Sequence, residues 1–384
     1  MSKAEYKRLG DYIREVNVRN RELKVTNLLG VNLSKQFFPS IANIIGTDLS
    51  KYKIIEKGQF GCKFMSVGRD GILPISLMQD DKPAIISSAY YVFEVKDQEV
   101  LLPEYLMMWL RRPEFDRQLW FYSGGDVRGG VNYDDFCEMP IIIPSITRQR
   151  EIVSEYETLT NRICLNNQMI QNLEATAQAL YHKMFVDGID KENLPEGWKM
   201  GTIGDFCKEM KSGGTPSRNQ NEYWNKNDYP WLKSGEVHNN IIVNIEEYIS
   251  QAGLDNSSAK IVPQGTVIMA MYGATAAQVA YLCCDSATNQ ACCNMICSSK
   301  EDAAYLFFHL LANQDEIKKL ANGGAQENLS QEIIAQQPIL LFNDEGVKSL
   351  FVPVLNNLIV RYKEILKLTE LQSLLLAKMG QEII

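Results

Sequence analysis

The side chains best suited to chemistry in this sequence are a group of cysteines. Five of the nine fall between Cys283 and Cys297, and thiolates are common zinc ligands. Cys283-Cys284 and Cys292-Cys293 are adjacent pairs, however, and neighbouring residues of a strand point to opposite faces. The CxxC spacing of typical zinc sites is absent. Small buried hydrophobic thiols in a reducing compartment are therefore the favoured interpretation, and a zinc site the alternative.

The three histidines do not form a catalytic pattern either. His182 and His309 both fall in helical patterns, where a packed or solvated histidine is the simpler interpretation. The sequence has neither the glycine-rich cofactor loop nor the Asp/Asn-Pro-Pro-aromatic loop of a DNA methyltransferase, and it has no GxxxxGK[ST] phosphate loop. We therefore expect no catalytic residue, no cofactor and no metal in this chain.

Composition limits the class of protein further. The chain has 384 residues and 45% hydrophobic content, which predicts two or three soluble domains. It has no apolar run long enough for a membrane helix and no signal-peptide pattern, so we expect a cytoplasmic protein without membrane partners. The net charge of −8 argues mildly against a chain that coats phosphates by itself, although residues 1–24 carry a local +3.

The elements that must position any binding residues are two long helices. From Ile152 to Met184, seam residues recur at steps that alternate between four and three, which is the period of a coiled coil. Asn166 is the polar member of this seam. The full series is Ile152, Tyr156, Leu159, Ile163, Asn166, Ile170, Leu173, Ala177, Leu180 and Met184.

A second series follows 195 residues later with the same rhythm, and Arg361 takes the place of Asn166. Two heptad runs with a shared polar layer indicate an internal duplication. Pro353 must lie within the first two turns of the second helix or kink it. The second series is Val347, Phe351, Val354, Leu358, Arg361, Ile365, Leu368, Gln372, Leu375 and Met379.

The duplication predicts an α+β chain in which two mixed domains alternate with the two helices. The predicted parts are domain one (1–146), a central helix (147–187), domain two (188–343) and a C-terminal helix (344–384). Because the ends of a compact domain usually lie close together, the helices should run antiparallel with pseudo-twofold symmetry. The predicted rod is about 50 Å long, with one domain at each end.

Within the domains, short apolar runs predict strands and helical spacing predicts helices. In domain one we expect a strand at 90–95, a helix at 103–119 and a strand at 141–144. In domain two we expect the corresponding strand at 265–270, a helical segment at 303–320 and a strand at 338–341.

Several short sequence motifs in the second half of the chain resemble those of a known family. They are Leu194-Pro195-Glu196-Gly197-Trp198, Ile203-Gly204-Asp205, Ser212-Gly213-Gly214-Thr215-Pro216-Ser217, Tyr223-Trp224 and Pro230-Trp231-Leu232-Lys233-Ser234-Gly235. Together they resemble a target recognition domain of type I restriction-modification specificity subunits. Domain one resembles a more divergent copy: residues 87–92 and 140–153 match, but the tryptophan and the Gly-Thr-Pro loop are absent, and Arg148 replaces the usual glutamate.

The resemblance implies a specificity subunit that performs no catalysis itself. Each domain would read one half of a bipartite, asymmetric site on double-stranded DNA, and the paired helices would set the gap. The helices would also dock two modification (methyltransferase) subunits, which restriction subunits with nuclease and translocase activity would join.

The resemblance also suggests which residues lie near DNA. In domain two these are Lys211, Ser212, Thr215, Ser217, Arg218, Trp231, Lys233, Ser234, Tyr272, Gly273, Asn289 and Gln290. In domain one they are Lys63, Arg69, Tyr90 and Arg128.

Each group has a structural alternative. The loop 211–218 combines hydroxyls, two glycines and positive charges that suit phosphate contact, but it can also be a structural turn. Trp231 can be a core anchor. Asn289 and Gln290 can read adenine through paired hydrogen bonds or can brace the fold, and Arg128 can be a solvated charge.

Two other functions compete with DNA recognition. A scaffold that only gathers partners would need the helices but not the duplicated domains, and a silent specificity allele would keep both. The duplicated domains favour DNA reading.

Overall fold

The computed structural model describes residues 6–40, 46–122, 131–187, 189–190, 193–321 and 328–380. The chain forms two compact units. Unit 1 combines Met1–Arg162 with Leu368–Ile384, and unit 2 is Ile163–Lys367. Both boundaries fall inside the long helices α5 (Ile146–Phe185) and α12 (Val352–Met379), so each unit contains a part of both helices. Within the described residues, no helix is long and apolar enough to span a bilayer.

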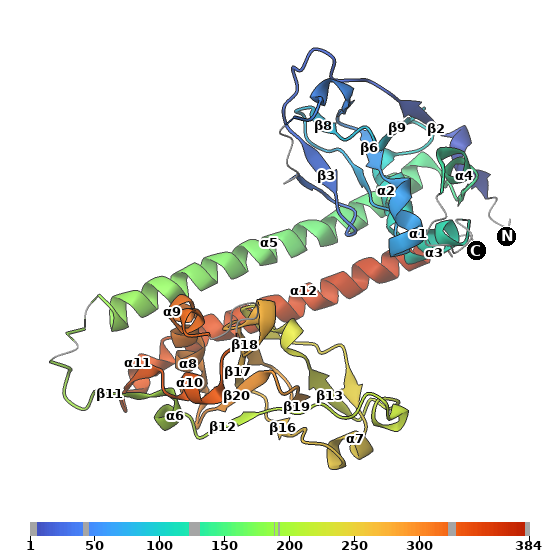
Figure 1. Cartoon of the computed structure of the whole chain (residues 1–384). Helices are drawn as coiled ribbons and strands as arrows, with labels where there is room; N and C mark the ends of the chain where they lie inside the picture. Colours follow the sequence, from blue (N-terminus) through green and yellow to red (C-terminus); the bar gives the residue numbers. More distant parts are fainter. Residues whose placement is uncertain are drawn as a thin grey trace. The chain divides into compact units, whose positions relative to one another are not determined.

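The main sheet of unit 1 has four antiparallel strands in the order β2-β9-β6-β7 (Figure 1). Their bounds are β2 Ile13–Val16, β9 Tyr91–Val95, β6 Gln59–Cys62 and β7 Ile75–Leu77. Three further pairs are β1 (Lys7–Arg8) with β10 (Pro140–Ile141), β3 (Leu29–Val31) with β4 (Phe37–Pro39), and β5 (Lys53–Ile55) with β8 (Ala84–Ile86). The remaining elements of unit 1 are η1 Leu9–Asp11, η2 Leu49–Lys51, η3 Phe64–Ser66, α1 Val67–Asp70, α2 Pro103–Arg111, α3 Pro113–Tyr122 and α4 Tyr133–Cys137.

Unit 2 repeats this plan with a five-stranded sheet in the order β12-β20-β17-β18-β14. The strands are β12 Glu209–Ser212, β20 Cys292–Ile296, β17 Val267–Ala270, β18 Val279–Leu282 and β14 Asn240–Ile242. A second sheet has the order β15-β13-β19-β16: Tyr248–Ile249, Tyr229–Leu232, Ser286–Thr288 and Ile261–Val262. The helical elements are α6 Ile203–Phe206, η4 Asn221–Tyr223, η5 Ser234–Glu236, α7 Gln251–Asp255, η6 Gly273–Thr275, α8 Lys300–Ala312, α9 Gln314–Lys319, α10 Gln331–Ala335 and α11 Glu345–Ser349.

The duplication is also visible where each domain begins and ends. In unit 1, β1 pairs with β10, and in unit 2, β11 (Lys199–Thr202) pairs with β21 (Pro338–Leu341). Gly10 lies so close to Cys137 that an added Cβ would stand 2.7 Å from the Cβ of Cys137, and Gly204 occupies the matching place beside Ala335. The Leu-Gly-Asp and Ile-Gly-Asp phrases are therefore the same packing feature, made twice.

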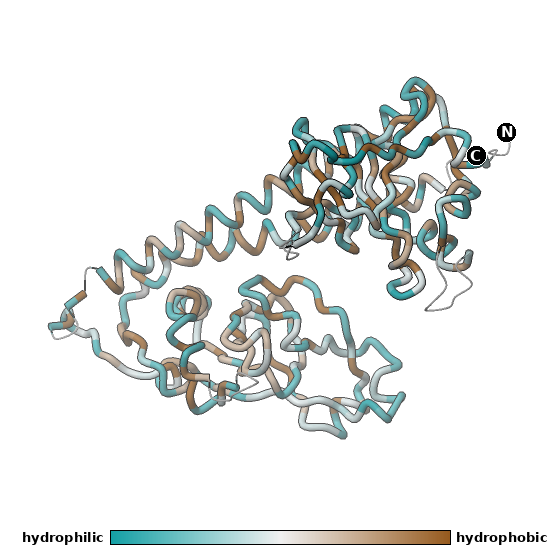
Figure 2. Tube along the Cα trace, turned by 45° about the horizontal axis from the view of Figure 1, so that its top comes forward, coloured by the Kyte–Doolittle hydropathy of each residue, from teal (hydrophilic) through white to brown (hydrophobic). Residues whose placement is uncertain are grey.

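The long helices follow the predicted seam. Every member of both seam series is buried or half-buried, whereas most intervening residues are exposed, and Figure 2 shows hydrophilic and hydrophobic segments alternating along both helices. Within unit 2, Arg361 Nη1 donates to Asn166 Oδ1 at 3.0 Å. Within unit 1, Gln372 Nε2 donates to Thr160 Oγ1 at 2.7 Å. In unit 2 the ring of Phe351, just before α12, also packs against that of Phe185, with centroids 6.0 Å apart. The helices are therefore antiparallel within unit 2, because 351 lies beside 185 and 361 beside 166.

Three predicted helices are interrupted, two of them at a proline. The helical segment expected at 303–320 consists of α8 and α9, which are separated at Asn313, where φ is −108° and ψ is 12°. The helix expected at 103–119 is two helices, because Arg112 before Pro113 adopts an extended ψ of 132°. The second seam begins in α11, and α12 starts only at Val352 with Pro353 in its first turn. The long helices are consequently unequal: 40 and 28 residues, or about 60 and 42 Å at 1.5 Å per residue.

The cores explain why the helices are apolar on more than one face. Ile152, Leu376 and Met379 belong to the core of unit 1, and Ile170, Phe351 and Leu358 to that of unit 2. Cysteines pack there as well, and burial raises the pKa of the Cys292 thiol to about 12. Among the described residues, no three side chains of the metal-binding types gather into a cluster.

Candidate nucleic-acid interface

Most of the predicted DNA-contacting residues of unit 2 gather at one edge of its sheets. Strands β12 and β17 end at this edge and β20 begins there, because β20 is antiparallel to both. Strands β13 and β19 are parallel and also end together, at Leu232 and Thr288. We call this region the reading edge. It consists of Lys211–Arg218, Lys233–Ser234, Met271–Gly273 and Asn289–Gln290.

The two adjacent glycines of the loop 211–218 serve protein packing. A Cβ on Gly213 would lie 2.1 Å from the carbonyl oxygen of Thr288, and a Cβ on Gly214 would lie 2.2 Å from Ser258 Oγ. Gly214 also donates its backbone N–H to the carbonyl oxygen of Thr288 at 2.8 Å. Close approach of two other segments of the chain therefore requires glycine at both positions.

Trp231 is a core residue. Its side chain is 2% exposed, and its indole N–H donates to the carbonyl oxygen of Gly214 at 2.9 Å. This burial leaves no surface for DNA and corrects the assignment of Trp231 to the interface. Trp224 packs edge-on against it with ring centroids 5.0 Å apart, and donates to the carbonyl oxygen of Ser217. Ser217 thus contributes its backbone to the fold of the loop.

Arg218 and Lys233 converge on one carboxylate. The Arg218 guanidinium lies 3.6 Å from the ring centroid of Trp224, and its Nη2 lies 2.7 Å from Glu247 Oε2. Lys233 Nζ lies 2.9 Å from Glu247 Oε1 and 3.5 Å from Glu246. The hydrogen bond to Glu247 raises the pKa of Lys233. Burial opposes ionisation of Glu247, but hydrogen bonds from Lys233 and Arg218 outweigh it and lower the pKa of this carboxyl.

The other candidate residues of unit 2 differ in how many contacts their side chains make within the protein. Lys211 pairs with Glu209 at 3.2 Å. Ser234 Oγ receives a long 3.5 Å hydrogen bond from Asn289. Tyr272 is 43% exposed, and the next residue, Gly273, has a φ of +73°, which favours glycine. Tyr272 therefore presents an aromatic side chain to solvent at the reading edge.

Unit 1 places Lys63 and Tyr90 at the matching edge of its own sheet, because β6 ends at Cys62 and the antiparallel β9 begins at Tyr91. Lys63 Nζ lies 5.9 Å from the Tyr90 ring centroid, and the Tyr90 hydroxyl accepts from Val31 N–H. Arg69 is exposed and paired with Asp70 at 2.8 Å. Arg128 lies outside the described residues.

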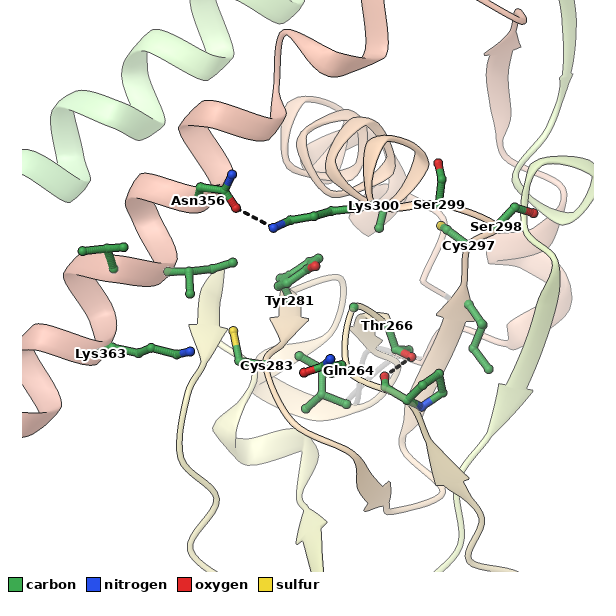
Figure 3. Close-up of a pocket in the computed structure, with 17 residues that line it drawn as sticks. Gln264, Thr266, Tyr281, Cys283, Cys297, Ser298, Ser299, Lys300, Asn356 and Lys363 are labelled. Carbon is green, nitrogen blue, oxygen red and sulfur yellow. Dashed lines mark hydrogen bonds between the residues drawn. The ribbon is translucent and has the colours of Figure 1, made fainter. Parts of the chain in front are cut away.

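A groove in unit 2 contains none of the predicted residues. It has a volume of about 610 Å³ and lies between α12, the start of α8, the loop before β17 and the ends of β18 and β20. Figure 3 shows Lys300 reaching across to Asn356, with a 2.5 Å hydrogen bond, and Lys363 pointing toward Cys283. A smaller groove of about 360 Å³ occupies the matching corner of unit 1, between α5, α2 and β7. The lining of the first carries two lysines and no acid, whereas the second carries three acids and one arginine.

Comparison with known proteins identifies the family. The family model described as "Type I restriction modification DNA specificity domain" matches residues 74–175 and 195–343, which is more than half of the chain. The chain belongs to this family. The two matched segments fall in the two halves of the duplication.

Similar proteins agree with this assignment. The specificity subunit of the type I restriction enzyme HindI from Haemophilus influenzae is 24% identical, and the alignment covers 97% of each chain. The specificity subunit of the Escherichia coli enzymes EcoR124I/EcoR124II is 31% identical over 70 residues, which is 18% of this chain and 17% of that one. In structure, the chain is similar to the type I S subunit from M. genitalium, with a TM-score of 0.58, 13% identity and coverage of 99% and 97%.

Sequence reasoning gave no role to three residues that contact the side chains of the reading edge in this structure. Glu247 belongs to no motif, and only its place before β15 brings it to Arg218 and Lys233. Gln331 lies outside every predicted element and motif, yet its Oε1 accepts a hydrogen bond from Ser212 Oγ at 3.1 Å. Trp224 had a signal, because it lies in the Tyr-Trp phrase of the family, and it proves to be the surface on which Arg218 stacks.

Proposed function

We propose that this chain supplies DNA sequence recognition to a type I restriction-modification system, with each unit reading one half of a bipartite, asymmetric target. The observation that carries the proposal is the repetition of the reading edge. Residues after β12 and β17 and before β20 in unit 2 correspond to residues after β6 and before β9 in unit 1. Two copies of one edge suit two half-sites.

We propose the previously predicted residues as the contact set, with Trp231 removed. In unit 2 the exposed or half-exposed side chains are Lys211, Ser212, Thr215, Ser217, Arg218, Lys233, Ser234, Tyr272, Asn289 and Gln290, together with Gly273. In unit 1 they are Lys63, Arg69 and Tyr90, with Arg128 as a further candidate. Basic side chains would contact phosphates, and amide and hydroxyl groups would meet base edges or hold in place the side chains that do.

The long helices are proposed to set the gap between the half-sites and to dock the partners. In unit 1, a groove between α5 and α12 exposes a strongly apolar surface in which Leu371 is 50% and Leu374 66% exposed, beside Leu159 and Leu375. Burial of such a patch against another protein is favourable. We assign it to a modification subunit, one of two that would supply the methyl transfer, and expect restriction subunits to join that complex.

The charge balance supports this division of labour. The chain has a net charge of −8, and Arg218, Lys233, Lys211 and Arg69 are all paired with carboxylates. The isolated chain should therefore bind DNA weakly and with strong salt dependence, and the modification subunits should supply much of the phosphate neutralisation.

Single-molecule sequencing of methylated DNA tests the proposal, in a host that expresses the chain with its cognate modification subunit. We expect a new bipartite methylated motif with a fixed unspecified gap. Insertion or deletion of one helical turn in α5 or α12 should change the gap and leave both half-sites unchanged. Absence of methylation despite a stable complex would contradict DNA recognition if the complex also failed to bind DNA, and would point to a scaffold.

A further inference from the structure

Three side-chain amides make hydrogen bonds with other side chains of the reading edge, and these bonds differ. They belong to Asn289, Gln290 and Gln331. A side-chain amide has an acceptor oxygen and a nitrogen with two donor hydrogens, and paired reading of adenine requires both groups to be free. The bonds that each amide already makes within the protein therefore decide what it can offer to a base.

Asn289 is committed to the fold at both ends. Its Oδ1 accepts from the backbone N–H of Ala291 at 3.2 Å and from Cys292 Sγ at 3.2 Å. Its Nδ2 points to Ser234 Oγ at 3.5 Å. These bonds shape the turn that connects β19 to β20, so Asn289 braces the reading edge.

Gln331 is also committed at both ends. Its Oε1 accepts from Ser212 Oγ at 3.1 Å, and its Nε2 donates to the carbonyl oxygen of Met210 at 3.1 Å. It joins the first turn of α10 to the last residues of β12, and each of its polar groups already makes a hydrogen bond within the protein.

Gln290 is the exception. Its side chain is exposed, and its Oε1 accepts a short hydrogen bond from the Thr215 hydroxyl. Its Nε2 makes no hydrogen bond to any described residue. Because Thr215 occupies the oxygen, the amide is oriented with its two N–H donors free, next to the exposed Tyr272 that follows β17.

We infer that Gln290 is a base-reading amide of unit 2, that Thr215 is the positioning residue that holds its oxygen and turns its two N–H donors outward, and that the base it faces is a guanine, an adenine or a thymine. Guanine presents O6 and N7, adenine presents N7 and thymine presents O4 as acceptors in the major groove. Cytosine presents only its N4 donor there, which cannot bind an N–H donor. In this orientation Gln290 therefore selects against cytosine. This inference rests on the proposed function, since it assumes that the reading edge faces DNA.

The test is methylation mapping of the full chain together with the modification subunit. Gln290→Glu replaces the free amide donor with an acceptor oxygen and keeps the shape. We expect one position in one half-site to change its preference toward cytosine or adenine, whose amino groups donate. Gln290→Ala should reduce discrimination at that same position by about tenfold, which corresponds to the loss of one good base contact. Both variants should keep the wild-type melting temperature, because the side chain is exposed.

Two matched variants separate reading from bracing. Thr215→Val frees the oxygen of Gln290, so adenine should become better tolerated at the position that Gln290→Glu changes. Gln331→Ala should lower the melting temperature and leave the motif unchanged. A motif that is identical in wild type, Gln290→Glu and Gln290→Ala would overturn the inference while leaving DNA recognition intact. A stable wild-type complex that shows no motif and binds no DNA would instead refute the proposed function itself.

Discussion

Glu247 holds two candidate DNA-binding cations, so its removal should strengthen DNA binding. Arg218 and Lys233 lie 2.7 and 2.9 Å from its two oxygens. A phosphate that approaches either cation must compete with this carboxylate. Glu247→Gln keeps the shape of the side chain, removes its charge and replaces one acceptor oxygen with an N–H donor, so it makes both cations available.

The magnitude follows from the exposure of the ion pairs. The three side chains are 51, 32 and 31% exposed, and each such pair contributes roughly 0.5 kcal/mol. Two released pairs amount to about 1 kcal/mol, or roughly fivefold in affinity at low salt. If both cations then contact phosphates, the log–log salt dependence should steepen by about 1.8.

Fluorescence anisotropy with a labelled duplex between 50 and 200 mM salt measures both quantities. Asp81→Asn is the matched control, because it also adds one positive charge to the chain and releases an exposed lysine, Lys57, from a 2.7 Å pair. Lys57 precedes β6, whereas Lys63 follows it, so the control charge lies at the opposite edge of its sheet. Equal effects of Glu247→Gln and Asp81→Asn would mean that only net charge matters, and would refute the assignment of Arg218 and Lys233 to the interface.

Three further predictions concern stability. Burial lowers the pKa of His309 to about 4, so below about pH 6.5 the unfolded chain takes up a proton that the folded chain does not. Urea titrations should show that the free energy of unfolding falls by up to about 3 kcal/mol between pH 6.5 and 4. In the His309→Gln variant this fall should be smaller. Asn166→Ala removes the oxygen that accepts a hydrogen bond from Arg361. It should lower the free energy of unfolding by about 1–3 kcal/mol in the same assay. An unchanged free energy of unfolding would mean that this hydrogen bond does not stabilise the helix pair. Gly213→Ala forces a methyl group to within 2.1 Å of a carbonyl oxygen, whereas Gly235→Ala meets nothing within 4 Å, so thermal melting should drop only for the first, with a cost of about 1–3 kcal/mol.

The sequence was most informative where a periodic pattern coincides with burial. The seam of α5 and α12 could be listed residue by residue, and even the meeting of Asn166 with Arg361 followed from the 195-residue repeat. The interruptions were the part that periodicity concealed. Pro113 and Pro353 carried the signal for two of the three, because a proline breaks the backbone hydrogen bonding that heptad spacing assumes. The break at Asn313 has no proline to announce it.

The interface was less predictable, because it depends on contacts between segments far apart in the chain. The loop around Thr215 was recognisable, but nothing in its sequence could show that Trp231 would be buried beneath it or that Glu247 would neutralise Arg218. Adjacent residues also differ in role. Both polar groups of the Asn289 side chain make hydrogen bonds within the protein, whereas Gln290 uses only its oxygen in this way. Residue type and motif do not distinguish the roles of these two residues. The hydrogen-bond partners of each side-chain atom do.

Unit 1 is built from two segments of the chain that are far apart in the sequence, and this has a consequence for the synthesis of the protein. Residues 1–162 emerge early from the ribosome, but their core also requires residues of the segment from 368 onward, and Leu376 and Met379 are only 8% and 3% exposed there. The unit that is begun first is therefore completed last. Until the last turns of α12 are translated, the apolar side chains around Ile152 and Val153 lack their cover and are open to chaperones and proteases. A chain that stops before 368 would carry this exposure permanently, so cellular quality control would remove it before it could compete for partners.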